Sequence, residues 1–269
     1  MKTNFHTHTT FCDGKNTAEE MVLAAIEKNF DVLGFSGHAM YPFSSDWHIG
    51  ARDIGAYCEE INRLKKAYEG KIQLKLGFEA DYIRAVTEPT FSAYDAFSPE
   101  YIIGSVHYIQ TKEAIFAIDS SLRELKEGIR THFSGDVKKA VQAYFSTERE
   151  MLRKGGFSII GHADLITKFQ EREKLFDEGE SWYVNELKAT ADEIKRAGVI
   201  AEINTGAIAR GHRTLPYPGE TFLSLLRERG VPVIISSDSH SVQSLDTAFG
   251  VARAVAQKAG YREILETIF

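Results

Sequence analysis

The chain contains little cysteine and no apolar run long enough to cross a bilayer. Only two of its 269 residues are cysteines, Cys12 and Cys58, and they form no Cys-x-x-Cys pair. So few thiols exclude a disulfide scaffold and favour a reducing compartment, so we expect the protein in the cytoplasm. The first residues, MKTNFHTHTT, include no apolar stretch of the kind found in signal peptides. We therefore expect no membrane partner.

The chain also has no excess of positive charge. It carries 32 basic and 38 acidic side chains, which gives a formal net charge of −6. That balance provides no electrostatic surface for nucleic acid, so we expect no nucleic-acid partner. A local basic pocket can still hold a small anion, because net charge says little about local potential. The composition, 43% hydrophobic and 26% charged, is that of an ordinary globular protein rather than a disordered one.

Low-complexity tracts, Pro/Gly linkers and repeats of fixed period are also absent, so we expect residues 1–269 to form a single domain. Short apolar runs alternate with longer amphipathic segments. The apolar runs are rich in Ile, Val, Leu and Phe and show little polar alternation, which predicts parallel strands buried on both faces. They are residues 2–6, 30–36, 72–79, 101–107, 157–162, 199–204 and 232–238.

Helical patterns lie between these runs. Thr17 begins the sequence TAEE, in which Glu20 completes a capping box. Helical spacing of apolar residues predicts further helices, and the less regular segment 84–100 is also predicted as a helix. The clear segments are 52–69, 136–154, 181–197, 218–230 and 244–259. Seven strand–helix units predict an α/β protein with a TIM-like (β/α)7 barrel, and an open doubly wound sheet is the alternative.

Polar side chains collect where the predicted strands end. Six of the nine histidines stand at or just beyond the C-terminal end of an apolar run. In a parallel barrel all these ends face one mouth, where such enzymes keep their active sites. Converging imidazoles and carboxylates predict a multinuclear site for transition-metal ions. The candidate ligands are His6, His8, Asp13, His38, Glu79, His107, His162, Asp238 and His240.

The spacing of these residues adds detail. His6 and His8 point to the same side of a strand, because the strand period is two, so one ion can take both. Glu79 stands alone on its strand, and its two oxygens suit a bridge between two ions. Asp13 and His38 could instead cap a turn or a helix. Three further polar residues are either ligands or groups that orient the imidazoles, namely Asp164, Glu202 and Asn204.

The ordered set of candidate ligands resembles the PHP (polymerase and histidinol phosphatase) superfamily along nearly the whole chain. The resemblance implies a distorted seven-stranded barrel with three metal ions at its mouth. It implies one ion on His6, His8, Glu79 and Asp238, a second on Asp13, His38 and His240, and a third on His107 and His162 that shares Glu79. Many members have a histidine where this chain has Asp13.

Several stretches resemble the monofunctional histidinol-phosphate phosphatases, among them SGHAMYP, GSVHYI, GDVKKAVQAYF, GHADLITKF, EINTGAIARG and PYPGETFL. The resemblance implies hydrolysis of L-histidinol phosphate to L-histidinol and phosphate in histidine biosynthesis. Two to three divalent ions would be required, and zinc, manganese or iron suits the mixed ligand set. A hydroxide held between two ions would then attack phosphorus.

Cations and aromatic rings in the loops are candidates for holding a small phosphorylated substrate. Lys168 and Arg210 follow the fifth and sixth strands and could clamp phosphate, with Arg213 as a substitute for Arg210. Each could equally be a solvated loop charge. Trp47 and His48 could recognise the amino or imidazole end of a substrate, or Trp47 could simply cover the barrel mouth.

Three other functions remain open at this point. The chain could be a PHP phosphoesterase that acts on a nucleotide or another small phosphorylated metabolite. It could be a metal-binding module without catalysis, although the intact ligand set argues against that. It could also be a metal-dependent C–N hydrolase on a related barrel.

Overall fold

The computed structural model describes residues 1–43, 45–112 and 114–268. Its centre is a sheet of seven parallel strands in the order β1-β2-β3-β4-β7-β8-β9. The strands are β1 (Thr3–Asn4), β2 (Val32–Phe35), β3 (Gln73–Asp81), β4 (Tyr101–Ser105), β7 (Ile159–Ile160), β8 (Ile200–Asn204) and β9 (Val233–Ser236). Each strand coincides with one predicted run, and β3 continues two residues beyond its run.

The sheet curves until its first and last strands meet. Just past β1 and β9, Thr7 and Ser239 form a parallel bridge. The N–H of His8 donates to the carbonyl of Ser239 at 2.8 Å, and the N–H of Ser239 donates to the carbonyl of His6 at 3.1 Å. The strand order contains no reversal, which excludes the doubly wound alternative. The prediction of a distorted (β/α)7 barrel is confirmed.

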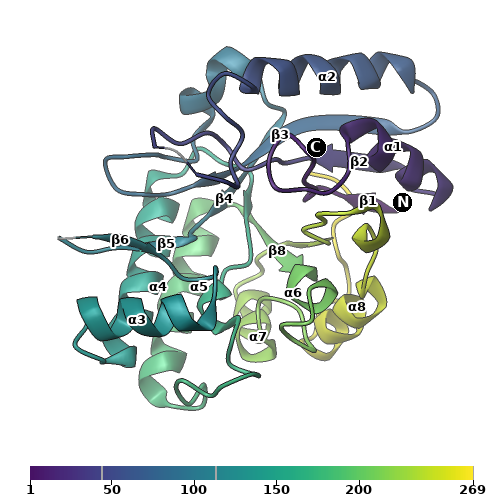
Figure 1. Ribbon diagram of the computed structural model, residues 1–269. Helices are drawn as coiled ribbons and strands as arrows, with labels where there is room; N and C mark the ends of the chain where they lie inside the picture. The colour runs from purple at the N-terminus through teal and green to yellow at the C-terminus, as the bar shows by residue number, and fades with distance from the viewer. Residues whose placement is uncertain (44, 113, 269) are drawn as a thin grey trace.

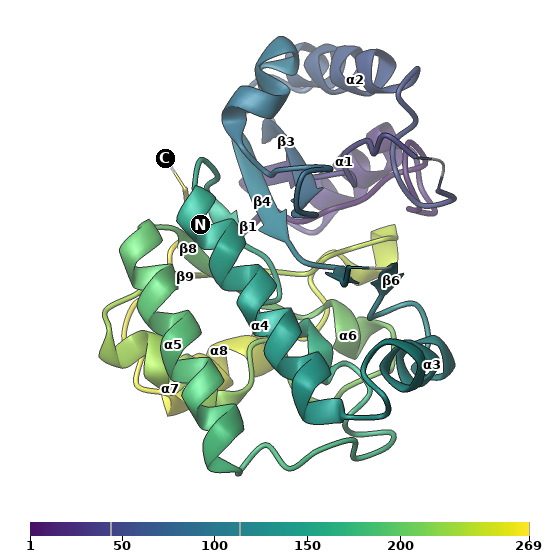
Figure 2. The ribbon, with the colours of Figure 1, turned by 90° about the vertical axis from the view of Figure 1, so that its left-hand side faces the viewer.

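Helices surround the barrel on its outer side (Figure 1). They are α1 (Ala18–Glu27), α2 (Ile54–Ala67), α3 (Leu122–His132), α4 (Val137–Lys154), α5 (Ser181–Ala197), α7 (Glu220–Glu228) and α8 (Phe249–Lys258). The short α6 (Gly206–Ala209) lies instead in the loop after β8, next to Asp238. Figure 2 shows α4, α5 and α7 side by side over one part of the barrel. The predicted capping box is present at the start of α1, where Thr17 and Glu20 bond to each other's backbone N–H. Among the described residues, no helix is long and apolar enough to span a membrane.

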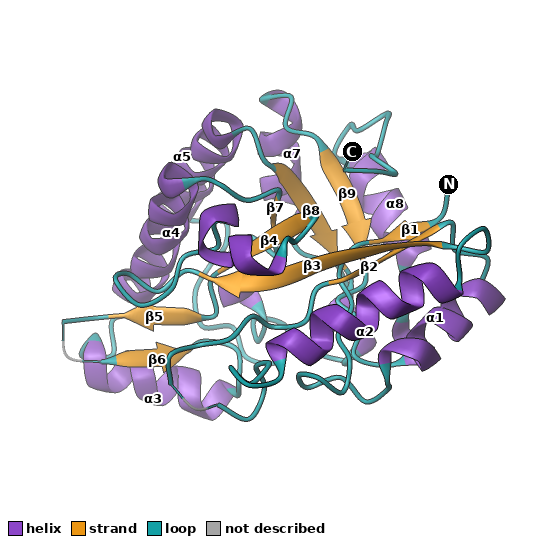
Figure 3. Cartoon of the chain, turned by 90° about the horizontal axis from the view of Figure 1, so that it is seen from above, coloured by secondary structure: helices purple, strands orange, loops and turns teal. Residues whose placement is uncertain are grey.

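The segment between β3 and α4 differs from expectation. The predicted helix 84–100 is wrong in extent, because only Phe91–Phe97 forms a helix, of 3-10 type (η1). Pro89 and Pro99 flank it, and proline cannot continue a helical hydrogen-bond ladder. The unpredicted hairpin of β5 (Tyr108–Gln110) and β6 (Ile115–Ala117) lies beside the unpredicted α3 at one side of the barrel (Figure 3). Two further 3-10 turns are η2 (Leu165–Thr167) and η3 (Val242–Ser244).

Tyr101 fills the inside of the barrel. It belongs to a small buried cluster that is separate from the larger core between strands and helices, and that consists of Phe5, Val32, Tyr101, Ile103, Ile159 and Ile234. Its hydroxyl donates to the carbonyl of Phe5 at 2.7 Å. Gly34 and Gly77 give the ring its space, since a Cβ on either would lie 2.4–2.5 Å from Tyr101 atoms.

Replacing Gly77 with alanine should therefore destabilise the fold. The added methyl would overlap Cε1 and Cζ of Tyr101 at 2.5 Å, and overpacking of this kind costs about 1–3 kcal/mol. Gly55 on α2 offers a matched control, because its Cβ position has nothing within 4 Å. Gly55→Ala should stabilise the helix by about 0.5–1 kcal/mol. Denaturant unfolding measures both variants, and equal stability of Gly77→Ala and the wild type would contradict the assigned packing.

Glu148 on α4 predicts a pH-dependent stability. Its side chain is buried, and one carboxyl oxygen accepts from Tyr144 at 2.8 Å while the other has no hydrogen-bond partner among the described residues. Burial raises the pKa of this carboxyl well above its usual value, and nearby Asp164 raises it further. The folded state therefore keeps the proton that the unfolded chain loses, and this stabilising contribution falls as pH rises above about 4.3.

Glu148→Gln cannot ionise, so it should lose less stability than the wild type between pH 5 and pH 8. The advantage should reach about 1.4 kcal/mol for each pKa unit separating the folded and unfolded carboxyl. Thermal unfolding of both proteins across this pH range measures the difference in their stability. The other titrating groups are the same in both proteins, so their contributions cancel in this difference. A stability difference independent of pH would show that Glu148 is ionised in the folded protein.

Candidate metal centre

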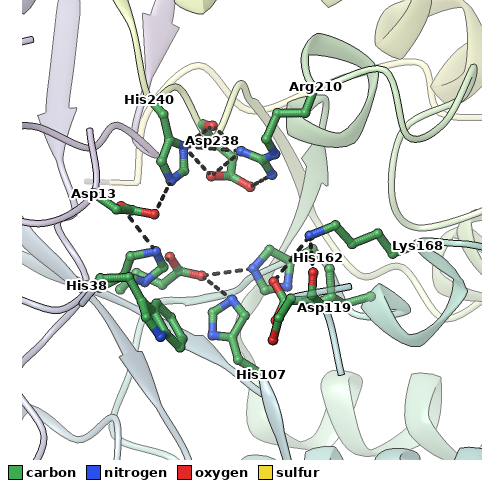
Figure 4. A pocket seen from close by; sticks show the side chains of 13 residues that line it. Asp13, His38, His107, Asp119, His162, Lys168, Arg210, Asp238 and His240 are labelled. Carbon is green, nitrogen blue, oxygen red and sulfur yellow. Dashed lines mark hydrogen bonds and ion pairs between the residues drawn. The ribbon is translucent and has the colours of Figure 1, made fainter. Parts of the chain in front are cut away.

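The C-terminal ends of the strands enclose a cavity of about 290 Å³ (Figure 4). Its walls combine imidazoles and carboxylates with two cations, and loops after six of the seven barrel strands contribute to it. The lining residues are Asp13, His38, Trp47, Glu79, His107, Asp119, Ser120, His162, Leu165, Lys168, Arg210, Asp238 and His240. His6 and His8 are fully buried against Glu79 and Asp238, which line the cavity.

Glu79, near the end of β3, stands at the centre of the cluster. Its Oε2 lies 3.0 Å from Nε2 of His6 and 3.0 Å from Nδ1 of His38. Its Oε1 lies 2.8 Å from Nε2 of His162 and 3.4 Å from Nε2 of His107. The carboxylate thus separates two groups of imidazoles, as the bridging position predicted for it requires.

Two aspartates lie across from Glu79. Oδ1 of Asp238 is 3.4 Å from Nε2 of His8 and 3.5 Å from Nδ1 of His240. Oδ2 of Asp13 is 3.1 Å from Nε2 of His240, and its Oδ1 is 3.7 Å from Nε2 of His38. The structure therefore brings all nine predicted ligands together, from segments as far apart as residues 6 and 240.

The donor atoms in this cluster fit divalent cations. Nε2 of His6, Nε2 of His8 and Nδ1 of His38 are buried and have no hydrogen-bond partner among the described residues. Each nevertheless faces a carboxylate oxygen at 3.0–3.5 Å. Buried polar atoms normally have a hydrogen-bond partner, so these nitrogens are suited to bind a ligand such as a metal ion. Three groups have donor atoms within 4.8 Å of one another, namely His8-Asp13-His38-His240, His6-His8-Asp238 and His38-Glu79-His107.

Carboxylates behind the cluster orient two of the imidazoles. Nδ1 of His6 donates to Oε1 of Glu202 at 2.7 Å, which leaves the lone pair of Nε2 free for a metal ion. Oε2 of Glu202 accepts from the backbone N–H of His162 at 3.1 Å and from the amide of Asn204 at 2.9 Å. Asn204 also donates to Asp238 at 3.3 Å. Glu202 and Asn204 thus contact the cluster from behind.

Asp81 has the same role for His107. Its carboxylate accepts from Nδ1 of His107 at 3.0 Å and from the hydroxyl of Tyr41. The sequence reasoning missed Asp81, although it follows Glu79 by two residues on one strand and so shares its face. Asp164 lies elsewhere, because its Oδ2 accepts from the N–H of Gly219 at 2.7 Å rather than from an imidazole.

The charges of the cluster follow from these contacts. Burial alone would raise the pKa of Glu79, but the surrounding imidazoles of His6, His38 and His107 outweigh it and hold that pKa well below its usual value. Burial lowers the pKa of His8 to about 3, assisted by the neighbouring His240 and His38. For His107, burial is outweighed by Asp81 and Glu79, which raise its pKa to about 10. The site thus holds an ionised carboxylate deep inside the protein.

Backbone strain also concentrates here. Asp238 has φ +48° and His162 has φ +21°, both in the left-handed region that side chains other than glycine rarely adopt. Each such residue costs of order 1 kcal/mol and persists where its surroundings fix it. Strained residues cluster at functional sites, and both of these are candidate ligands.

The predicted substrate-binding residues fall into two groups. Lys168, Arg210 and Trp47 line the cavity, whereas Arg213 and His48 are not among the described residues that line it. Nζ of Lys168 donates to the carbonyl of Asp119 at 2.6 Å, and Nη2 of Arg210 donates to Asp238 at 2.8 Å. Asp119 and Ser120 also line the cavity. The sequence pattern did not point to them, because they follow a hairpin that this pattern did not predict.

Residues 4–206 match the PHP domain family. The chain therefore belongs to this family, and the resemblance stated from its sequence is confirmed. A curated relative is the histidinol-phosphatase of Bacillus subtilis, 25% identical over 264 residues that cover 92% of this chain and 97% of the relative.

Two solved structures share the fold along nearly their whole length. One is a structure from Listeria monocytogenes that is named a histidinol phosphatase. It has a TM-score of 0.82 at 24% identity, and the alignment covers 93% of this chain and 99% of that chain. The other is the histidinol phosphate phosphatase of Lactococcus lactis with zinc, L-histidinol and phosphate. It has a TM-score of 0.74 at 20% identity, covering 98% of this chain and 95% of that chain.

The contact between His6 and Glu202 predicts a metal-binding defect. Glu202→Gln removes the negative charge behind His6 and so lowers the basicity of Nε2, and such changes typically weaken metal affinity about 10- to 100-fold. Competition with a chelating dye measures the Zn²⁺ affinity of the purified variant. Glu228→Gln, an exposed residue at the end of α7, should bind Zn²⁺ like the wild type. Equal affinity for Glu202→Gln and the wild type would contradict the role of this carboxylate.

Proposed function

We propose that this protein is a metal-dependent phosphomonoesterase that hydrolyses L-histidinol phosphate to L-histidinol and phosphate. The observation that carries the proposal is the composition of the cavity, in which an imidazole and carboxylate wall faces the cations of Lys168 and Arg210. Relatives named histidinol-phosphatase that align over nearly their full length support the choice of substrate. So does the Lactococcus lactis structure, which contains L-histidinol and phosphate.

The cluster would hold two to three ions of zinc, manganese or iron. When bound, such ions lower the pKa of water to supply a nucleophile and neutralise charge on phosphate oxygens. Glu79 would lie between the ions, since its two oxygens face separate imidazole groups. Asp13 and Asp238 complete the carboxylate ligands on the far side of His8 and His240.

The chain's own cations would fix the phosphate group. Phosphoryl transfer depends mainly on positioning and on positive charge at the non-bridging oxygens. Lys168 is held against Asp119 and Arg210 against Asp238, so both enter the cavity from fixed positions. Trp47 lines the same cavity and meets the ring of His38 edge-on, with ring centroids 4.8 Å apart. We assign it to the organic end of the substrate.

A substrate panel on the purified, metal-loaded enzyme tests the proposal. The protein should contain about two to three transition-metal ions per chain and lose phosphatase activity on chelation. Because specific polar contacts discriminate strongly between substrates, kcat/KM for L-histidinol phosphate should exceed that for AMP and sugar phosphates by at least about 100-fold. Preference for AMP would select the nucleotide alternative, and full activity in chelator would exclude metal-dependent hydrolysis.

We also assign residues 1–269 to one domain. Strands from both ends of the chain, β1 and β9, are neighbours in the barrel, and ligands come from both.

A further inference from the structure

The loop after β7 carries Lys168 and the loop after β8 carries Arg210. Both loops contain little regular structure, only η2 in the first and the short α6 in the second. The two cations nevertheless enter the same cavity from these separate loops (Figure 4). Asp119 and Asp238 hold the ends of the two side chains. Contacts between the two loops also influence the spacing of the cations, because neither loop is part of the barrel sheet.

Among the described residues, three hydrogen-bonded pairs of residues connect the two loops, and we call these pairs together the loop clasp. The carboxylate of Asp164 accepts from the N–H of Gly219 at 2.7 Å. Glu171 accepts from the N–H of Thr214 at 2.9 Å. Between these two contacts, Nη1 of Arg213 donates to Oγ1 of Thr167 at 2.5 Å. The clasp thus spans residues 164–171 on one side and 213–219 on the other.

Along the chain, the Arg213 contact is the one closest to the cations. Thr167 is fully buried and directly precedes Lys168, and Arg213 lies three residues after Arg210. Oγ1 of Thr167 also donates to the carbonyl of Asp164 at 2.7 Å, so the hydroxyl links the guanidinium to the backbone of its own loop. These two bonds connect Arg213 to the backbone segment that carries Lys168.

Arg213 is poorly explained as a stabilising residue. Its side chain is only 8% exposed, yet the nearest carboxylate oxygen of Glu171 is 4.0 Å away. Its Nε has no hydrogen-bond partner among the described residues. The guanidinium packs 4.7 Å from the ring centroid of Tyr217. Among the described residues, this buried guanidinium makes one hydrogen bond, one loose ion pair with Glu171 and a longer-range interaction with Asp164. Such a combination contributes little net stability.

We infer that Arg213 is a positioning residue that fixes Lys168 relative to Arg210 and thereby sets the affinity of the cavity for phosphate. This inference rests on the proposed function and assigns to Arg213 a role different from direct phosphate binding. Misplacement of a binding group by about 1 Å can cost up to 100-fold in a site of this kind. We therefore expect Arg213→Met to weaken phosphate binding about tenfold.

A double-mutant cycle on the metal-loaded enzyme tests the inference, with the dissociation constant of inorganic phosphate measured by calorimetry. Arg213→Met should weaken binding about tenfold in the wild-type background but less than about twofold in the Lys168→Met background, because coupled residues are not additive. Thr167→Val should reproduce Arg213→Met without a change of charge. It also serves as the test variant if Arg213→Met does not fold.

Arg172→Met is the matched control for charge. Arg172 is an exposed cation on the same loop as Lys168, so its loss changes the net charge equally but leaves the clasp intact. It should change phosphate affinity less than about twofold, as expected for a screened surface charge. If Arg172→Met and Arg213→Met have equal effects, Arg213 acts through the long-range field and the inference is wrong.

The remaining outcomes separate this inference from the proposed function. Equal effects of Arg213→Met in both backgrounds, in an enzyme that hydrolyses L-histidinol phosphate, would overturn the inference alone. Coupling in a protein that binds phosphate but does not hydrolyse L-histidinol phosphate would support the inference and overturn the assigned substrate. A wild-type protein that binds no phosphate would overturn both.

Discussion

The structure depends on the stabilisation of one buried carboxylate. Glu79 is 1% exposed and ionised, and an isolated charge in such a position costs several kcal/mol or more. Imidazoles on both sides and the hydroxyl of Ser105, which donates to Oε1 at 2.7 Å, offset part of this cost. Nε2 of His6, Nε2 of His8 and Nδ1 of His38 have no hydrogen-bond partner among the described residues, so cations bound between these nitrogens and the carboxylate would complete the balance.

That arrangement requires a closed, parallel barrel. Only parallel strands deliver their C-terminal ends to one mouth, and closure through Thr7 and Ser239 brings Asp238 and His240 beside His8. Tyr101 fills the interior below the mouth, with Gly34 and Gly77 leaving space for its ring. The apolar filling excludes water from beneath the cluster, which strengthens the electrostatic interactions above it.

The sequence predicted the parts of the site that local pattern encodes. Each candidate ligand follows an apolar strand, so the strand period and the barrel geometry were sufficient to place His6, His8 and Glu79 together. The residues that orient these ligands were harder to predict from the sequence. Asp81 and Glu202 contact the imidazoles because of the direction of their side chains, and a carboxylate at either position could equally be a metal ligand. The strands of the β5–β6 hairpin are only three residues long and mostly half-buried, so no strong period marks them. Asp119 and Ser120 follow it and were missed for that reason.

Arg210 and Arg213 show where local sequence stops being informative. They lie three residues apart in one loop, and the sequence offered them as substitutes for each other. The structure separates them, because Arg210 bonds to Asp238 in the cavity while Arg213 bonds to Thr167 across the loops. The direction of each side chain is set by residues 28 and 46 positions away along the chain, which no pattern within the loop contains.

The charges around the cavity link the metal centre to the binding of a phosphate ester. Among the described lining residues, four carboxylates face only two cations, so the wall is formally anionic when its imidazoles are neutral. Lys168 and Arg210 are moreover each partly neutralised by an aspartate. With its imidazoles neutral, as metal binding requires, the wall has too little positive charge of its own to attract a dianion, and two or more divalent ions would supply that charge. Metal ions would therefore contribute to the binding of a phosphate ester as well as to its hydrolysis. The loop cations would contribute mainly through their positions, so the contacts that fix those positions would matter more than the number of cations.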